Sequence, residues 1–482
     1  MRSILLLPLL TGILAGCTVG PDYAGPPKAV SDAAPPAGFV RGDAQAVTAA
    51  PPVADWWKPL GDPLLDDLIA RALAGNTDVK TGEARLRQAQ AALGEQRANL
   101  GPKASASALY AHAHVPGVAF GQSDSGSDSG SDSGGSGDGT DLNLYNLGFN
   151  ASWEIDLFGG QRRAVEAARA GIEGAEASLA DVQVSIAANV AKSYLDLRDR
   201  QQRIALGQQS IAWQEEALGL TRQRLERGTA TAMEVAQAEG QLASARAQIA
   251  PLAAERDAFM NALATLTAQA PGALDAALAP AGEIPLPPAA VPVGDPARLI
   301  ANRPDIRAAE RELAADTAKI GQAEAARFPR LSFMGLIGIG GTKISDLGKL
   351  DDFTALAAPQ LSWSFLDFGR NKAKVGQAEA VRDEAEARYR GTVLTALRDA
   401  EDSLARYREG RVTVAALART RDKAALAESL TEQRFQAGTA TRIALLDARG
   451  QRNSAEQNLV SARAALTADY VAIQKALGLA WK

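Results

Sequence analysis

The most informative reactive residue in this sequence is its single cysteine, Cys17. An apolar run, Ile4–Leu14, leads into Ala15-Gly16 just before it. The run is too short to span a bilayer and is typical of a signal-peptide core. Small residues before a lone cysteine indicate a lipoprotein box, in which the thiol takes a diacylglycerol and cleavage follows Gly16. We therefore expect residues 1–16 to be a signal peptide and Cys17 to carry a covalent lipid. The alternative is an ordinary signal peptide with an incidental cysteine.

No other group of residues predicts catalysis or metal binding. His112 and His114 could share one face of a strand, but the sequence offers no third ligand. The stretch 338–343 is rich in glycine but fits neither phosphate-loop spacing. Within the Gly/Ser/Asp tract 121–140, the stretch 134–139 has glycine where the calcium-binding nonapeptide pattern needs aspartate. The net charge of −5 also argues against a nucleic-acid partner. We expect no enzyme, no metal and no cofactor besides the lipid.

The elements that position these residues are repeated. Segment 220–231 reappears as 430–441, an offset of 210 residues (438 − 228) that also carries Trp153 onto Trp363. Upstream, an offset of 227 (329 − 102) carries Pro102 onto Pro329. The two offsets differ because tract 121–140 is inserted between Pro102 and Trp153. This tract is expected to be flexible and exposed. The chain is therefore predicted to be two copies of one unit.

The predicted domain boundaries follow from this duplication. Residues 17–61 are predicted to form an N-terminal tether, extended over its Pro-, Ala- and Gly-rich part, and residues 269–297 are predicted to form a Pro-rich linker between the copies. The first copy occupies 62–268 and the second 298–482. In the first copy a helix is predicted from Asp62 to about Leu100.

Each copy contains a pair of strands with one apolar face. From Tyr145 to Ile155, apolar and polar residues alternate, and Trp153 ends the apolar face. Strands are predicted within about 104–156 and 331–367, and Trp363 takes the corresponding place in the second copy. Tryptophan at the margin of an apolar band favours a membrane interface. The alternative is a half-buried soluble sheet.

Long helices follow the strands, at about 160–227 and 370–437. Shorter helices return at about 231–268 and 441–477, and Pro251 is expected to break or kink the first of these. Glycine ends each long helix and threonine begins each returning one, which predicts two tight helical hairpins. The predicted tips consist of Gly228, Thr229, Ala230 and Thr231 and of Gly438, Thr439, Ala440 and Thr441.

Four strands per chain cannot close a barrel, and open strand edges are not tolerated in lipid. The smallest closed barrels have about eight strands, so the chain is predicted to oligomerise. Only 5% of residues are aromatic although 46% are hydrophobic, which suits slender helices packed closely together. We expect a strand barrel in the membrane at one end and a tube of helices that reaches into the periplasm at the other.

Several motifs resemble the outer-membrane efflux protein family, in the lipoprotein branch typified by OprM and NodT. They are Cys17-Thr18-Val19-Gly20-Pro21-Asp22-Tyr23, Asp55-Trp56-Trp57, Arg303-Pro304-Asp305-Ile306-Arg307-Ala308-Ala309-Glu310 and Arg327-Phe328-Pro329-Arg330-Leu331-Ser332. The resemblance implies a TolC-like homotrimer, mainly α with membrane β. It further implies a 12-stranded outer-membrane barrel, an α-helical barrel in the periplasm and a mixed equatorial domain. The implied function is the exit duct of a tripartite resistance-nodulation-division (RND) efflux pump, lipid-anchored and joined to the pump through a periplasmic adaptor.

The resemblance also suggests site residues. Asp447 lies in the second copy, and the corresponding residue of the first copy is Gln237, so only the second copy has a carboxylate at this position. The resemblance implies that, in a trimer, three copies of Asp447 form a ring of carboxylates. This ring, together with Ile443, is implied to narrow the channel at its periplasmic end. A solvated aspartate, or one paired with Arg442, is the alternative. The two tips are implied to dock the adaptor, although capped turns alone would also explain their likeness.

Two other functions are compatible with the sequence. A protein-secretion duct of the same fold is the nearer one. A periplasmic coiled-coil adaptor or scaffold is the other, but it predicts one helical hairpin rather than two.

Overall fold

The computed structural model describes residues 18–28, 38–42, 46–51, 53–115, 140–348 and 353–478. The chain forms two compact units. The strand unit consists of Met1–Gly25, Ala89–Gly171 and Leu313–Glu384. The helical unit consists of Pro26–Gln88, Ile172–Glu312 and Ala385–Lys482.

The strands are β1 (Val47–Thr48), β2 (Lys103–Val115), β3 (Thr140–Ile155), β4 (Val291–Pro292), β5 (Arg330–Gly341) and β6 (Phe353–Ser362). The α-helices are α2 (Pro63–Gly75), α3 (Thr77–Ala98), α4 (Gly160–Glu226), α5 (Ala232–Leu266), α6 (Asp275–Leu278), α7 (Pro296–Asn302), α8 (Pro304–Ala325), α9 (Arg370–Gln436) and α10 (Arg442–Ala476). Two short 3₁₀ helices are η1 (Lys58–Leu60) and η2 (Ile344–Gly348). Among the described residues, no helix is both long enough and apolar enough to cross a membrane.

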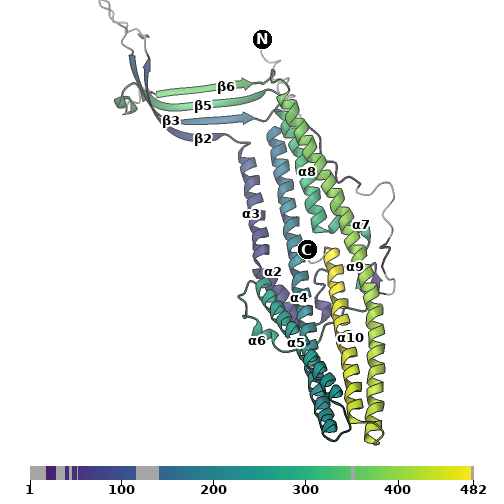
Figure 1. Cartoon of the computed structure of the whole chain (residues 1–482). Helices are drawn as coiled ribbons and strands as arrows, with labels where there is room; N and C mark the ends of the chain where they lie inside the picture. The colour runs from purple at the N-terminus through teal and green to yellow at the C-terminus, as the bar shows by residue number, and fades with distance from the viewer. Residues whose placement is uncertain are drawn as a thin grey trace, which may run out of the picture. The chain divides into compact units, whose positions relative to one another are not determined.

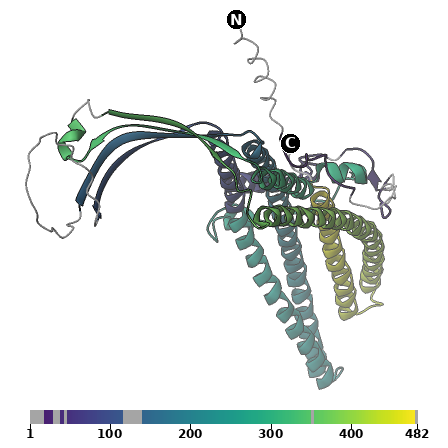
Figure 2. The ribbon, with the colours of Figure 1, turned by 90° about the horizontal axis from the view of Figure 1, so that it is seen from above.

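The strand unit contains one antiparallel sheet in the order β2-β3-β5-β6, which curves along its length (Figures 1 and 2). The register places Phe149 opposite Ile337 and Trp153 opposite Phe333. The apolar faces predicted for two strands of different copies are therefore one continuous face. The outer loop predicted at 121–140 lies almost entirely outside the described residues.

The predicted end of the second strand pair is wrong. The sequence predicts strand as far as 367, but β6 ends at Ser362, which pairs with Arg330 at the start of β5. Pro329 precedes Arg330 and has no backbone N–H to donate, so the ladder stops there. Trp363 consequently lies one residue beyond the strand, whereas Trp153 lies within β3.

The helical unit contains the two predicted hairpins. In each of them a long helix is followed by a shorter antiparallel helix (Figure 1). Helices α4 and α9 both have 67 residues, and α5 and α10 both have 35. These bounds lie within two residues of the predicted ones. Helix α5 continues through Pro251, so the proline does not break it.

The single helix predicted over 62–100 is wrong, because Asn76 divides it into α2 and α3. The Asn76 backbone is extended, with φ −56° and ψ 138°. Its side-chain oxygen accepts the amide hydrogen of Asp78 at 2.8 Å and its Nδ2 donates to the carbonyl of Leu266 at 2.9 Å. Asparagine caps a following helix in this way. The same side chain thus starts α3 and fixes it to α5.

The predicted tether contributes to the core of the helical unit. Trp56 is 1% exposed, and its backbone carbonyl accepts the hydroxyl hydrogen of Tyr470 at 2.7 Å. Strand β1 of the tether pairs in parallel with β4 of the linker. Both segments therefore contain ordered elements beside stretches without regular structure.

Candidate functional site

Both tips have the same backbone structure. Gly228 and Gly438 have φ values of 72° and 71°, in a region that residues with a side chain rarely adopt. The amides of Gly228 and Thr229 donate to Leu225 and Arg224, at 2.9 and 2.8 Å. The corresponding amides of the second tip donate to Phe435 and Arg434, at 3.0 and 2.8 Å. Each tip is a Schellman turn, which favours glycine at that position.

The two tips differ in how the returning helix begins. The Thr231 side chain accepts the amide hydrogen of Glu234, and the Glu234 carboxylate accepts the Thr231 amide at 2.6 Å, which completes a capping box. The bonds that the amide and the hydroxyl of Thr231 donate to this carboxylate lower the pKa of Glu234. Thr441 accepts the amide hydrogen of Ala444 at 3.1 Å, and alanine cannot return a bond. The first tip is therefore the more firmly capped.

Both tips are available to a partner. Gly228, Thr229, Gly438 and Thr439 are exposed, and nothing lies within 4 Å of where a side chain on either glycine would stand. The short, mostly uncharged side chains leave the backbone of each turn open.

Asp447 lies in the second turn of α10 and one turn after Ile443. Leu445 and Leu446 are 0% and 3% exposed, whereas Asp447 is exposed. Asp447 lines a groove of about 640 Å³ bordered by α4, α5, α9 and α10, whose lining includes Gln214, Gln241, Gln451 and Asn458. Within the described part of the chain no ion pair involves Asp447.

The Asp447–Arg442 pair considered as an alternative is not formed, because Arg442 binds Glu216. Its Nε and Nη2 donate to the two carboxylate oxygens of Glu216 on α4, at 2.6 and 3.1 Å. The hydrogen bond with Arg442 lowers the pKa of Glu216. Since α10 belongs to the second hairpin and α4 to the first, this pair ties the hairpins together close to their tips. Nothing in the sequence singled out Glu216.

Among the residues that the structure describes, much of the apolar face of the sheet is exposed. Phe149, Ile337 and Leu361 are 67%, 52% and 69% exposed. On one surface the four strands present alanine, leucine, isoleucine, phenylalanine, tryptophan and tyrosine at successive paired positions. A large exposed apolar surface marks contact with a membrane or another protein.

The two tryptophans make matching hydrogen bonds at the same end of this face. The indole of Trp153 donates to the carbonyl of Leu100 at 2.9 Å, and that of Trp363 donates to Arg327 at 3.1 Å. Arg327 is 227 residues after Leu100, the upstream offset of the repeat. An apolar ring with a satisfied N–H suits the boundary between an apolar and a wet region.

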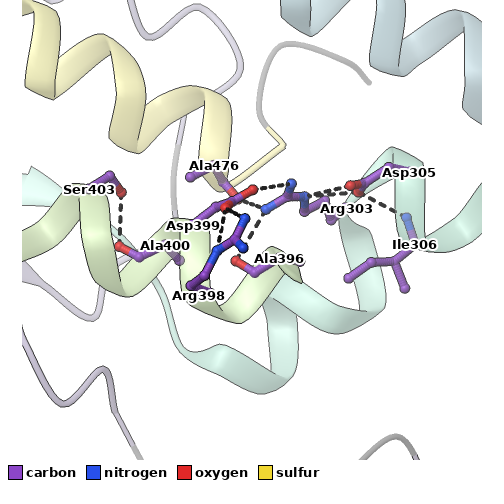
Figure 3. Close-up of polar contacts among 9 residues, drawn as sticks. All are labelled: Arg303, Asp305, Ile306, Ala396, Arg398, Asp399, Ala400, Ser403 and Ala476. Atoms are coloured by element: carbon purple, nitrogen blue, oxygen red, sulfur yellow. Dashed lines mark hydrogen bonds and ion pairs between the residues drawn. The ribbon is translucent and has the colours of Figure 1, made fainter. Parts of the chain in front are cut away.

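Arg303 connects three elements of the helical unit (Figure 3). It donates to the carbonyl of Ala476, at the end of α10, at 2.8 Å and to that of Ala396 on α9 at 3.3 Å. Its Nε donates to Asp305 at 2.9 Å, and Asp399 lies 3.6 Å from its Nη2. Its side chain is only 12% exposed. This arginine is structural, although the sequence pattern did not reveal its partners.

No metal centre is present among the described residues, since no three histidine, cysteine, aspartate or glutamate side chains gather there. The Nδ1 of His112 lies 2.9 Å from Oδ1 of Asn143, its neighbour on β3. Cys17 lies outside the described residues.

Comparison with known proteins gives matches over almost the whole chain. Residues 68–269 and 296–479 match a family model described as outer membrane efflux protein. Nodulation protein T of Rhizobium leguminosarum bv. trifolii is 30% identical over 98% of this chain and 96% of its own length. The pyoverdine export outer membrane protein OpmQ of Pseudomonas aeruginosa is 31% identical over 89% of this chain and 88% of its own. The structure of the outer-membrane channel OprN superposes with a TM-score of 0.83 and 32% identity, covering 96% of this chain and 99% of that chain.

Proposed function

This chain belongs to the outer membrane efflux protein family, and from that premise we propose that it is the exit duct of a tripartite RND-type pump. The duct conducts substrates passively from the periplasm to the exterior. The observation that carries the proposal is the exposed apolar face of the β2-β3-β5-β6 sheet on a chain that also has two long helical hairpins. A membrane-embedded sheet requires such a face, and a coiled-coil adaptor does not.

The proposed assembly is a TolC-like homotrimer with a 12-stranded barrel. The 4-stranded sheet has β2 at one edge and β6 at the other, and the strands alternate in direction. A β6 edge can therefore pair in antiparallel fashion with the β2 edge of a second copy. Closing all edges in this way satisfies every backbone group in lipid. Three copies give twelve strands, a size within the range of known barrels.

The duplication is part of this proposal. It is supported by the equal lengths of the two hairpins, the two Schellman turns and the matching hydrogen bonds of Trp153 and Trp363. In a trimer, two hairpins per chain give a tube lined by six. The mixed segments 17–61 and 269–297 form the equatorial region.

We assign the two glycine-threonine tips to adaptor docking and Asp447, with Ile443, to the periplasmic gate. The tips are supported by their exposure and open backbone, and the gate by the exposure of Asp447 and its place in the groove between the hairpins. Cys17 is assigned the lipid that anchors the chain to the outer membrane, and Trp153 and Trp363 the membrane interface.

The test uses the purified full-length chain in planar bilayers. The proposal expects a trimeric mass in detergent and discrete conductance steps. It also expects cysteines placed on the outer edges of β2 and β6 to cross-link between copies. Cysteines on the central strands β3 and β5 serve as the control, and cross-linking there but not at the edges would contradict the barrel. Deletion of the gene should increase sensitivity to at least one exported compound, with recovery on complementation.

A further inference from the structure

The segment directly after Cys17 is held in the strand unit by a buried arginine. Arg163, in the first turn of α4, has a side chain only 4% exposed. Its Nε and Nη2 donate to the carbonyls of Val19 and Gly20, at 3.3 and 3.2 Å. Nη2 also donates to the carboxylate of Asp22 at 2.6 Å. A guanidinium with its donors fixed in one plane is well suited to reading a bent peptide in this way.

Other contacts complete the site. Glu166 accepts the remaining arm of Arg163 at 2.8 Å, so the charge is balanced within α4. The amide of Val19 donates to the carbonyl of Phe158 at 3.1 Å. Tyr23 packs on an alanine cluster made by α4 and α8. The segment is therefore fixed through backbone, charge and apolar contacts.

The fit depends on three glycines. A side chain on Gly20 would overlap the Cα of Gly321 on α8. A side chain on Gly321 would come within 2.9 Å of both Arg163 and the carbonyl of Val19. A side chain on Gly159 would come within 2.7 Å of Thr18. We call this site, made of Arg163, Glu166, Gly159 and Gly321, the anchor clamp.

We infer that the anchor clamp positions the lipid-bearing end of the chain at the base of the membrane sheet. Gly159 lies between the end of β3 and the start of α4, so Thr18 is held where the sheet ends. Cys17 is the next residue in the sequence, and an acyl chain on it joins the polypeptide one residue from the clamp. The inference rests on the proposed lipid anchor. Its consequence is that the lipid and the sheet enter the bilayer side by side, rather than joined by a slack tether.

A positioning role differs from a purely structural one in depending on the length of chain between lipid and clamp. The experiment therefore compares two ways of separating them. In the first, Arg163→Ala or Gly321→Ala opens the clamp. In the second, six Gly/Ser residues inserted between Cys17 and Thr18 lengthen the connection and leave the clamp intact. The matched controls are Arg169→Ala, an exposed arginine on the same helix, and Gly376→Ala, a helical glycine with open space around it.

Two readouts are taken on the full-length protein. Hydrogen exchange at residues 18–25 should accelerate at least tenfold in Arg163→Ala and Gly321→Ala and stay unchanged in the insertion variant and the controls. The yield of assembled channel in the outer membrane, per acylated chain, should fall at least threefold in all three altered proteins and not in the controls. Arg163→Lys should recover only part of the protection, because an ammonium cannot bind both carbonyls and the carboxylate in one plane.

Full assembly of the insertion variant would overturn the positioning role. Unchanged exchange in Arg163→Ala would overturn the clamp itself. Mass spectrometry of the wild-type N-terminus separates these results from the proposed anchor. A Cys17 without lipid would remove the anchor, yet the exchange experiment would still report on whether the segment is clamped.

Discussion

The ion pair between Glu216 and Arg442 should hold the proposed gate closed, and Glu216→Gln should release it. The pair joins α4 of the first hairpin to the first turn of α10, five residues before Asp447. Freed from Glu216, that turn and the carboxylate behind it can move away from the first hairpin. Glutamine keeps the shape of the side chain but removes its charge, so the change tests the electrostatic tie alone.

The size of the effect follows from geometry and exposure. The guanidinium is bidentate, which favours a strong pair, but the two side chains are 32% and 40% exposed. Exposed pairs contribute about 0.2–1 kcal/mol, and this geometry places the pair near the upper value. A loss of about 1 kcal/mol per chain changes an open-to-closed ratio about fivefold. If three pairs in a trimer open together, about 3 kcal/mol changes the ratio by about 150-fold.

Single-channel recording in planar bilayers measures this ratio as open probability. Glu216→Gln should raise it, and the exchanged pair Glu216→Arg with Arg442→Glu should bring it back towards wild type. Because Arg442 lowers the pKa of Glu216, the folded pair keeps its charge until the pH falls below the usual range of a glutamate. The wild-type open probability should therefore be the same at pH 7 and pH 5. An unchanged open probability in Glu216→Gln at low salt would refute the tie.

Three further predictions follow from the same sites. Asp447→Asn should lower the preference of the pore for cations over anions in reversal-potential measurements, whereas Asn458→Asp, in the same groove, should raise it; equal selectivity in all three proteins would contradict the gate. Gly438→Val should lower the free energy of unfolding by about 1–2 kcal/mol through strain at positive φ, and it should weaken adaptor binding in pull-down assays. Gly438→Asn should do neither, because asparagine tolerates that φ. Arg303→Met should destabilise the helical unit by about 2 kcal/mol in urea unfolding, because it leaves Asp305 and the carbonyls of Ala396 and Ala476 without their donor, whereas Asp399 keeps its pair with Arg398. An effect below about 0.5 kcal/mol would show that water replaces the guanidinium.

The parts of the fold that depend on neighbouring residues in the sequence could be predicted from it. The long helices were located within two residues because glycine and threonine mark their ends. The strand faces were predicted from alternation, and the register then joined them. The resemblance to the efflux family was carried by short motifs and is confirmed over most of the chain.

The parts that failed depend on partners distant in the sequence. Asn76 ends α2 because its side chain reaches Leu266, 190 residues away. The tether is ordered at Trp56 because Tyr470 packs there, 414 residues away. Neither partner leaves a local signal. Nor does Glu216, which becomes meaningful only when Arg442 is seen beside it.

The repeat itself sets the limit of prediction at the tips. The two hairpins share the Schellman glycine that turns the chain, and they differ at other positions. Position 234 carries a glutamate that caps the first hairpin, and its counterpart is Ala444. Position 237 carries glutamine, and its counterpart is the carboxylate of Asp447. The more weakly capped hairpin is thus the one that carries the proposed gate and is tied by Arg442 to its neighbour. A hairpin that must move benefits from a weak cap and a breakable tie, whereas one that must stay in place benefits from a capping box. Exchanging the two residues, with Glu234→Ala and Ala444→Glu, should therefore lower the open probability of the channel while leaving its trimeric mass unchanged.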